Sequence, residues 1–307
     1  MDKFQLSESD SEIKEESNNA PQLKNRLFQI FFDLFAITII FIAFILIYTL
    51  MKPYTNYFFC NDTDIFYPYK PDTVELWVVA VYGVLGPIFF IILTELKNSK
   101  IINFNSKSRE LNKNSKRIKV KTFFICLFHA LSIFFLGIAI SLLITEIGKR
   151  WIGRLRPYFI DVCKPDLTKL NCTINTLSGL VYNRIYTGDN FCTGDEKKIA
   201  EARLSFPSGH ASFSCYTMTF LILFIEARLS LLRFRYLKSL IQLLALIAAF
   251  ITCISRVSDY HHRGSDVIGG AVIGLVIGIF VNMVTGRVLW EYKIEEKKYE
   301  LDNNEKA

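Results

Sequence analysis

Six apolar stretches, each close to the length of a bilayer crossing, constrain this chain more than any other feature. A helix needs about 20 residues to cross a hydrocarbon core of about 30 Å, and within that core its backbone polar groups must pair inside the segment. The stretches are Leu27–Leu50, Glu75–Leu96, Phe123–Gly148, Ala211–Ala227, Leu240–Ile254 and Val267–Thr285. A hydrophobic content of 51% argues against an ordinary soluble domain. We therefore predict an all-α integral membrane protein with six transmembrane helices.

The segments outside these stretches are polar. Residues 1–26 lack the positively charged start and short apolar core of a signal peptide, and their acidic composition predicts a disordered cytosolic tail. We expect one membrane domain over residues 27–287 and a cytosolic tail over residues 288–307.

The distribution of basic residues predicts the orientation in the membrane. An even number of spans places both termini on one side, and Lys and Arg are dense in Lys97–Lys121 and Arg228–Lys238. The positive-inside rule assigns these loops, and with them both termini, to the cytosol. The loop over residues 150–206 is also basic, but long loops translocate largely regardless of charge. Glycosylation sequons at Asn61 and Asn171 lie in the two loops that this topology places outside.

Four of the seven cysteines fall in these outer loops, which face an oxidising compartment. They are Cys60, Cys163, Cys172 and Cys192. Their spacing allows disulfides but does not determine which cysteines pair, and free or partly paired thiols are the alternative.

Three polar clusters lie where spans meet the outer face. They are Lys149–Pro157, Ser205–Ser212 and Ser255–Asp266. Lys149, Arg156 and Arg256 supply positive charge and donors suited to phosphate oxygens. A helix that begins near Ser208 and Gly209 adds free backbone N–H groups and the positive end of its dipole. A single basic residue here would be read as a membrane anchor, but the three clusters together predict a pocket for a phosphate dianion.

The histidines divide into one within a span and three within the clusters. His129 is interpreted as a packing residue of the third span. His262 precedes Asp266 by four residues, so a carboxylate one helical turn on would accept its Nδ1–H and leave Nε2 free as a nucleophile. His261 would point elsewhere. His210, beside the phosphate pocket, is the candidate general acid and base.

A zinc site is the alternative use of the third cluster. Asp259, His261, His262 and Asp266 include residue types that bind zinc. Phosphate-binding arginines crowd the same segment, so we predict no metal and no other cofactor.

The clusters resemble the three signature motifs of the type 2 phosphatidic acid phosphatase superfamily, in order and in spacing. The matching residues are Lys149, Arg156-Pro157, Pro207-Ser208-Gly209-His210, Ser255-Arg256, His262 and Asp266. Six spans and the stretches Phe66–Thr73 and Ser205–Ser214 are similar to the lipid phosphate phosphatase subgroup. The resemblance covers roughly residues 25–290.

The resemblance implies Mg²⁺-independent hydrolysis of phosphatidate, lysophosphatidate, sphingosine 1-phosphate or ceramide 1-phosphate through a phosphohistidine on His262. It also implies that His210 is the acid and base and that Asp266 orients His262. The phosphate would be held by Lys149, Arg156, Ser208, Gly209 and Arg256. His261 and Arg263-Gly264 depart from common residues of the subgroup, which leaves the rim of the site and the substrate preference open.

Other functions remain open at this point. The same residues would suit a phosphotransferase or a phosphatase of soluble phosphates, and a non-catalytic channel or scaffold is a third interpretation. Expected partners are phospholipid and sphingolipid phosphates and membrane lipids, and no nucleic acid. Gly270, Gly274 and Gly278 form a stripe for close helix packing, either in a homo-oligomer or within one chain. The predicted location is the plasma membrane, with an extracellular site, or an internal membrane, with a lumenal site.

Overall fold

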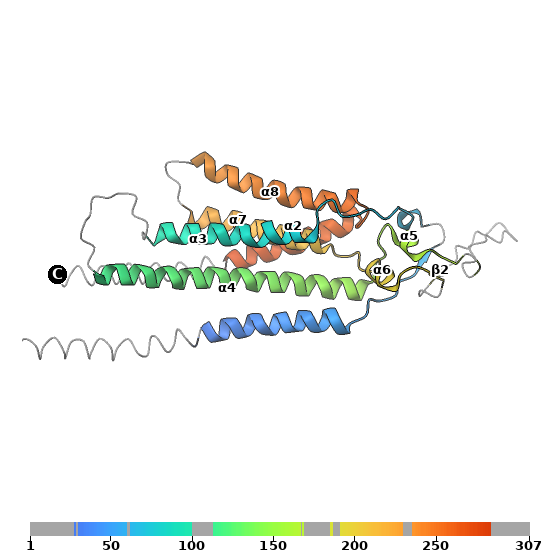
Figure 1. Cartoon of the computed structure of the whole chain (residues 1–307), viewed down its shortest axis with the longest axis horizontal. Helices are drawn as coiled ribbons and strands as arrows, with labels where there is room; N and C mark the ends of the chain where they lie inside the picture. Colours follow the sequence, from blue (N-terminus) through green and yellow to red (C-terminus); the bar gives the residue numbers. More distant parts are fainter. Residues whose placement is uncertain are drawn as a thin grey trace, which may run out of the picture.

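The helices of this chain run alongside one another, parallel to the long axis of the molecule (Figure 1). The computed structural model describes residues 28, 30–59, 62–99, 113–166, 168, 185, 186, 191–229 and 235–283. Within these residues, six helices are long and apolar enough to cross a membrane. They are Ile30–Leu50, Leu76–Asn98, Phe123–Ile152, Gly209–Arg228, Tyr236–Ser258 and Gly264–Met283. The predicted all-α fold with six spans is thus confirmed.

The boundaries differ most at the fifth span. The sequence predicts it over Leu240–Ile254, whereas the observed span is Tyr236–Ser258, within helix α8 (Arg235–Ser258). Hydropathy alone misses the added turns because they contain Tyr236 and Lys238, which hold an aromatic or aliphatic body in an apolar region and a polar end in water.

The remaining spans contain the other long helices. The second span consists of α2 (Leu76–Ala80), a π-helical turn η2 (Val81–Leu85) and α3 (Gly86–Asn98). The third lies within the 40-residue helix α4 (Lys113–Ile152), and the fourth is α7 (Gly209–Arg228). The first helix (Ile30–Leu50, blue in Figure 1) and the last helix (Gly264–Met283, red) complete the set.

Short elements from several loops lie at one end of the bundle. They are β1 (Phe58–Phe59), the 3₁₀ turn η1 (Thr63–Ile65), α5 (Phe159–Cys163), β2 (Ile185–Tyr186) and α6 (Glu196–Glu201). β1 pairs antiparallel with β2 and places Phe58 opposite Tyr186. Phe58, Phe159 and Ile199 belong to one buried apolar cluster, which gives this end a core of its own.

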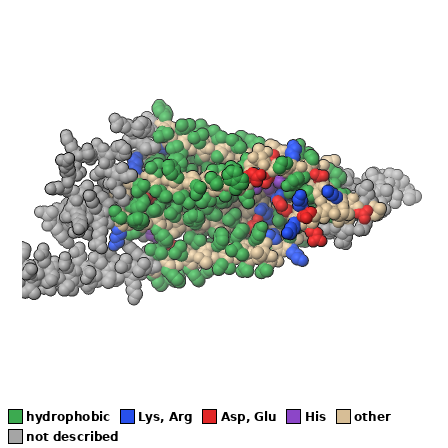
Figure 2. Space-filling model, in the orientation of Figure 1, with side chains coloured by type: hydrophobic (Ala, Val, Ile, Leu, Met, Phe, Trp, Pro, Cys, Tyr) green, Lys and Arg blue, Asp and Glu red, His purple; other side chains and the backbone are tan. Residues whose placement is uncertain are grey.

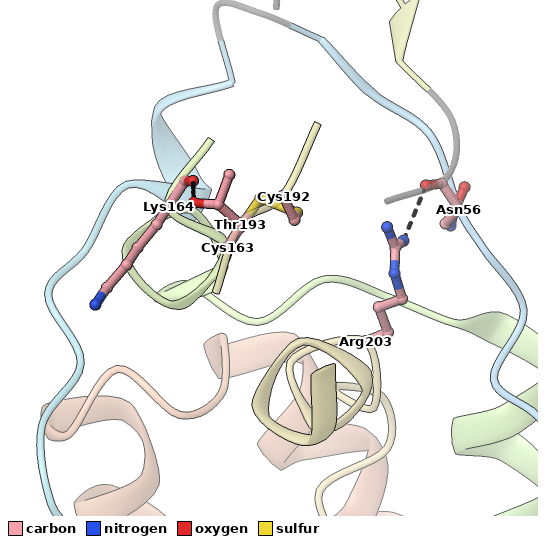
Figure 3. The surroundings of a disulfide bond; sticks show 6 residues. All are labelled: Asn56, Cys163, Lys164, Cys192, Thr193 and Arg203. Atoms are coloured by element: carbon pink, nitrogen blue, oxygen red, sulfur yellow. Dashed lines mark hydrogen bonds between the residues drawn. A yellow bond between two sulfur atoms is a disulfide. The ribbon is translucent and has the colours of Figure 1, made fainter. Parts of the chain in front are cut away.

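A disulfide joins Cys163 to Cys192 within these loops (Figure 3). Beside it, Thr193 Oγ1 donates to the carbonyl oxygen of Lys164 at 2.6 Å. Of the two alternatives left open for the loop cysteines, a disulfide is the one observed for this pair. Cys60, Cys172, the sequon residues Asn61 and Asn171 and the two predicted tails lie outside the described residues.

Helix α7 is the centre of the membrane core. Its Tyr216, Phe220 and Phe224 are buried against Phe134 of α4, and Tyr216 donates its hydroxyl proton to the Phe134 carbonyl oxygen at 2.7 Å. A polar group at this depth needs such a partner, because the surroundings offer no water. The core therefore fixes α7 against α4.

The glycine stripe packs the last helix onto α7. A Cβ at Gly270 would collide with the carbonyl oxygen of Ser208, and one at Gly274 with that of Ser212. Glycine is needed here because two helix backbones approach each other closely. Of the two uses predicted for the stripe, packing within one chain is the one observed.

Replacement of Gly274 by Ala should therefore destabilise the protein, because the added methyl group meets backbone that cannot rotate away. Overpacking of this kind costs about 1–3 kcal/mol. Gly86→Ala is the matched control, since a Cβ at Gly86 meets nothing within 4 Å. Thermal unfolding in detergent should show a lower Tm for Gly274→Ala only, and equal Tm values in the two variants would contradict this packing.

Candidate active site

The three polar clusters meet at one end of the bundle. The Ser205 N–H donates to the carbonyl oxygen of Arg154 at 3.0 Å, and the Ser208 N–H donates to that of Asp266 at 3.0 Å. Figure 2 shows charged side chains gathered at this end, beyond a long apolar band. The predicted convergence of the clusters is therefore confirmed.

Lys149 lies beside the start of α7. Its Nζ donates to Glu146 Oε1 at 2.6 Å, one turn earlier on α4. A Cβ at Gly209 would lie 3.1 Å from the same Nζ, so the ammonium group sits against the first residue of α7. The first N–H groups of a helix have no partner within the helix and carry the positive end of its dipole. Lys149 and α7 thus direct positive charge at the same point.

Four buried polar atoms at this point lack a hydrogen-bond partner among the described residues. They are Ser208 Oγ, His210 Nε2, Arg156 Nε and Glu146 Oε2, and the last lies 3.5 Å from Arg150 Nε. Arg156 is held through Nη1, which donates to the Tyr158 hydroxyl at 2.6 Å and to Glu201 Oε1 at 3.0 Å. A buried polar group without a partner is costly. An oxyanion with several acceptor atoms would satisfy the two donors, Ser208 and Arg156, together.

Arg256 is held from outside by a segment that we name the outer strap (Tyr67–Val74). The guanidinium donates to Asp72 Oδ1 at 2.6 Å and to the Val74 carbonyl oxygen at 3.0 Å, and a third contact reaches Asp259 Oδ2 at 3.3 Å. Thr73 N–H and Oγ1 both donate to Asp259, at 2.8 and 2.6 Å. Arg256 is only 1% exposed, so the strap fixes a buried positive charge at the edge of the site.

His261 points to the outer strap and has no hydrogen bond to Asp266, as predicted, and its Nδ1 lies 3.4 Å from Arg156 Nη1. Its Nε2 lies 2.9 Å from the Lys70 carbonyl oxygen, and its ring contacts those of Tyr69 and Tyr158. Asp259 is bonded to Thr73 and Arg256. Among the residues that the structure describes, no three His, Cys, Asp or Glu side chains form a metal-binding group. That the reaction needs no cofactor stays a prediction.

The predicted hydrogen bond between His262 and Asp266 is wrong. His262 Nδ1 instead lies 2.7 Å from the carbonyl oxygen of Ser205. The last helix begins at Gly264, after His262, so the two residues are not one turn apart on the same helix. Asp266 turns back and accepts the Arg263 N–H at 2.9 Å, which is half of a capping box.

The predicted tautomer of His262, with its hydrogen on Nδ1, is nevertheless the one that the structure favours. A backbone carbonyl can accept a hydrogen bond but cannot donate one, so the contact with Ser205 places the hydrogen of a neutral His262 on Nδ1. The lone pair is then on Nε2.

The surroundings of His262 favour its neutral form. Burial lowers the pKa of His262 well below its usual 6.5, and the charges of Arg156 and Lys149 lower it further. Lys149, Arg156 and Arg256 also act electrostatically on His210, which places both histidines among the same cations. The imidazole of His262 therefore lies uncharged among positively charged side chains.

Several residues of the site were missed by the sequence reasoning. They are Asp72, Glu146, Arg154 and Ser205. Glu146 precedes Lys149 by three residues, a helical spacing that could have revealed it. Asp72 is about 190 residues from its partners in the sequence, and no local pattern links them.

Comparisons with known proteins agree with the motifs. The model of the PAP2 superfamily matches residues 130–290. The chain is 34% identical to phospholipid phosphatase 1 of Mus musculus, over 84% of each chain. It is 31% identical to phospholipid phosphatase 2 of Homo sapiens, over 83% of this chain and 82% of that one. A solved structure, the transmembrane PAP2 type phosphatidylglycerolphosphate phosphatase of Bacillus subtilis, matches 67% of this chain and 98% of its own, with 17% identity and a TM-score of 0.32.

The lowered pKa of His262 predicts a stability change in acid. The unfolded chain binds a proton at this residue below about pH 6.5, whereas the folded chain resists it. The contribution of His262 to the free energy of unfolding is therefore fully present above about pH 6.5. It falls on acidification, by up to ~1.4 kcal/mol per pH unit, until the folded pKa is reached.

Thermal unfolding in detergent at about pH 7.5 and about pH 5.5 measures this effect. Wild type should lose more in Tm on acidification than His262→Gln. An equal loss in both would show that His262 titrates normally.

Proposed function

Because the chain belongs to the PAP2 superfamily, we propose that it is a lipid phosphate phosphatase that hydrolyses phosphomonoesters of membrane lipids. Its relatives include proteins named phospholipid phosphatase 1 and phospholipid phosphatase 2. The observation that carries the proposal is the set of unpartnered buried atoms, Ser208 Oγ, His210 Nε2 and Arg156 Nε, beside Lys149 and the start of α7. These groups suit a phosphate at the end of a membrane-spanning bundle.

The proposed reaction has two steps. His262 Nε2 attacks phosphorus, the bond from phosphorus to the lipid oxygen breaks, and His210 gives its proton to that oxygen. In the second step His210 takes a proton from water, the water oxygen attacks phosphorus, and the bond to His262 Nε2 breaks. Inorganic phosphate and the two original histidines result.

The cations supply the electrostatic part of the mechanism. Phosphoryl transfer spreads negative charge over the equatorial oxygens, and fixed donors stabilise that charge without reorganisation. Lys149, Arg156, Ser208 and the first residue of α7, Gly209, would hold these oxygens. Arg256 would add its charge from the strap side. With such neutralisation the proposed reaction proceeds without Mg²⁺.

The proposed substrates are single-phosphate lipids, namely phosphatidate, lysophosphatidate, sphingosine 1-phosphate and ceramide 1-phosphate. Their phosphates would lie at the depth where the spans end, close to Lys149 near the end of one span and Gly209 at the start of another. The site would face the extracellular space or the lumen of an internal membrane, with both termini in the cytosol.

His262→Ala and His210→Ala should each reduce phosphate release from phosphatidate in detergent micelles containing EDTA by at least about 1000-fold. The loss of a nucleophile or of general acid catalysis accounts for such an effect. His129→Ala, a histidine in the middle of α4, is the matched control and should retain activity.

Full activity of folded His262→Ala would contradict the nucleophile. Loss of wild-type activity in EDTA, restored by Mg²⁺, would contradict the metal-independent reaction.

The proposed orientation predicts glycans on Asn61 and Asn171. Treatment with a glycosidase should increase the mobility of the protein on a gel, and each Asn→Gln variant should reproduce part of the shift. Modification of neither residue in a glycosylating cell would remove the support that these sequons give to an outer site.

A further inference from the structure

Ser205 is the residue at which all three polar clusters are joined. Its N–H donates to the Arg154 carbonyl oxygen at 3.0 Å, and its own carbonyl oxygen lies 2.7 Å from His262 Nδ1. Its Oγ donates to Asp266 Oδ2 at 2.6 Å. The residue is fully buried. Every polar group of Ser205 therefore has one defined partner within the site.

Asp266 is fully engaged by residues other than His262. Oδ2 accepts from Ser205 Oγ and from the Arg263 N–H, while Oδ1 accepts from Arg154 Nη1 at 2.7 Å. The carboxylate is 0% exposed. A buried carboxylate with three donors is held in one orientation. Asp266 is therefore connected to His262 by hydrogen bonds through Ser205, whose side chain contacts Asp266 and whose carbonyl contacts His262.

We propose that Ser205 is a positioning residue that transmits the orientation of Asp266 to the imidazole of His262. The inference rests on the proposed role of His262 as the nucleophile. The Oγ–H···Asp266 bond fixes the side chain of Ser205, and the Arg154 contact fixes its N–H. Together they direct the Ser205 carbonyl at His262 Nδ1.

The chemical value of this direction lies in the first step of the reaction. When Nε2 forms its bond to phosphorus, the ring becomes cationic and its Nδ1–H a stronger donor. A carbonyl already in place stabilises that state without rearrangement. A carbonyl free to move would support it less, so loss of the Ser205 hydroxyl should slow turnover more than it weakens substrate binding.

A double-mutant cycle with Ser205→Ala and Asp266→Asn tests the proposal. Phosphate release from phosphatidate micelles gives kcat and KM for wild type, both single variants and the double variant. We expect Ser205→Ala to lower kcat about 10-fold, the effect of losing one hydrogen bond to a charged group, with KM nearly unchanged. The double variant should be no slower than the slower single variant, because both substitutions interrupt one route.

Ser212→Ala is the matched control. Its hydroxyl is also buried and has two partners at 2.8 Å, Ser141 and Thr145, one turn into α7. It should change kcat by less than about 2-fold. Ser205→Cys, which keeps a weak donor of similar size, should be faster than Ser205→Ala, and it replaces that variant in the cycle if Ser205→Ala does not fold.

Multiplicative losses of kcat in the double variant, or a Ser205 defect confined to KM, would overturn the proposal. The mechanism on which it rests is tested separately, by trapping the phosphoenzyme from substrate labelled in its phosphate in alkali-quenched wild type and His262→Ala, because a phosphohistidine is stable in alkali and hydrolyses in acid. A His262-dependent phosphoenzyme with multiplicative effects refutes the role of Ser205 alone. No phosphoenzyme in the active wild type refutes the nucleophile, and the role of Ser205 with it.

Discussion

The close approach of the last helix to α7 is the constraint on which the site depends. Gly270 faces the carbonyl of Ser208, the residue before the start of α7, and Gly274 faces that of Ser212 one turn later. A side chain on either glycine would separate the two helices at the point where the second and third polar clusters meet. The Ser208 N–H bond to the Asp266 carbonyl exists only at this separation. Packing inside the membrane therefore sets the geometry of groups at its edge.

The distribution of charge in the site follows from the low polarity of the membrane core. A membrane core does not solvate isolated ions, so the cations of the site lie at the ends of spans and each is held by a specific acceptor. Lys149 has Glu146, Arg156 has Glu201, and Arg256 has Asp72. These carboxylates keep the cations in place. Ser208 Oγ and His210 Nε2, beside the start of α7, have no hydrogen-bond partner in the part of the chain that the structure describes. We interpret this division as preorganisation for an oxyanion.

The sequence was sufficient to predict the spans and the convergence of the three clusters, since both depend on local hydropathy and on residue spacing. It was insufficient for the partner of His262. That prediction assumed a helix reaching back to residue 262, whereas the helix begins at Gly264 and its first turn uses Asp266 as a cap. Backbone partners such as the Ser205 carbonyl carry no sequence signal. The Asp72–Arg256 bond joins distant segments, so only the folded chain reveals it.

The proposed mechanism depends on a bond between His262 Nε2 and phosphorus. A structure of the protein with orthovanadate, which adopts the five-coordinate geometry of a phosphoryl-transfer transition state, would show whether His262 Nε2 is the atom that attacks. We expect vanadium bonded to His262 Nε2, with its oxygens contacted by Lys149, Arg156, Ser208 and the Gly209 N–H, and with His210 beside the oxygen opposite His262. Vanadium bonded to another residue, or bound with His262 Nε2 out of contact, would contradict it.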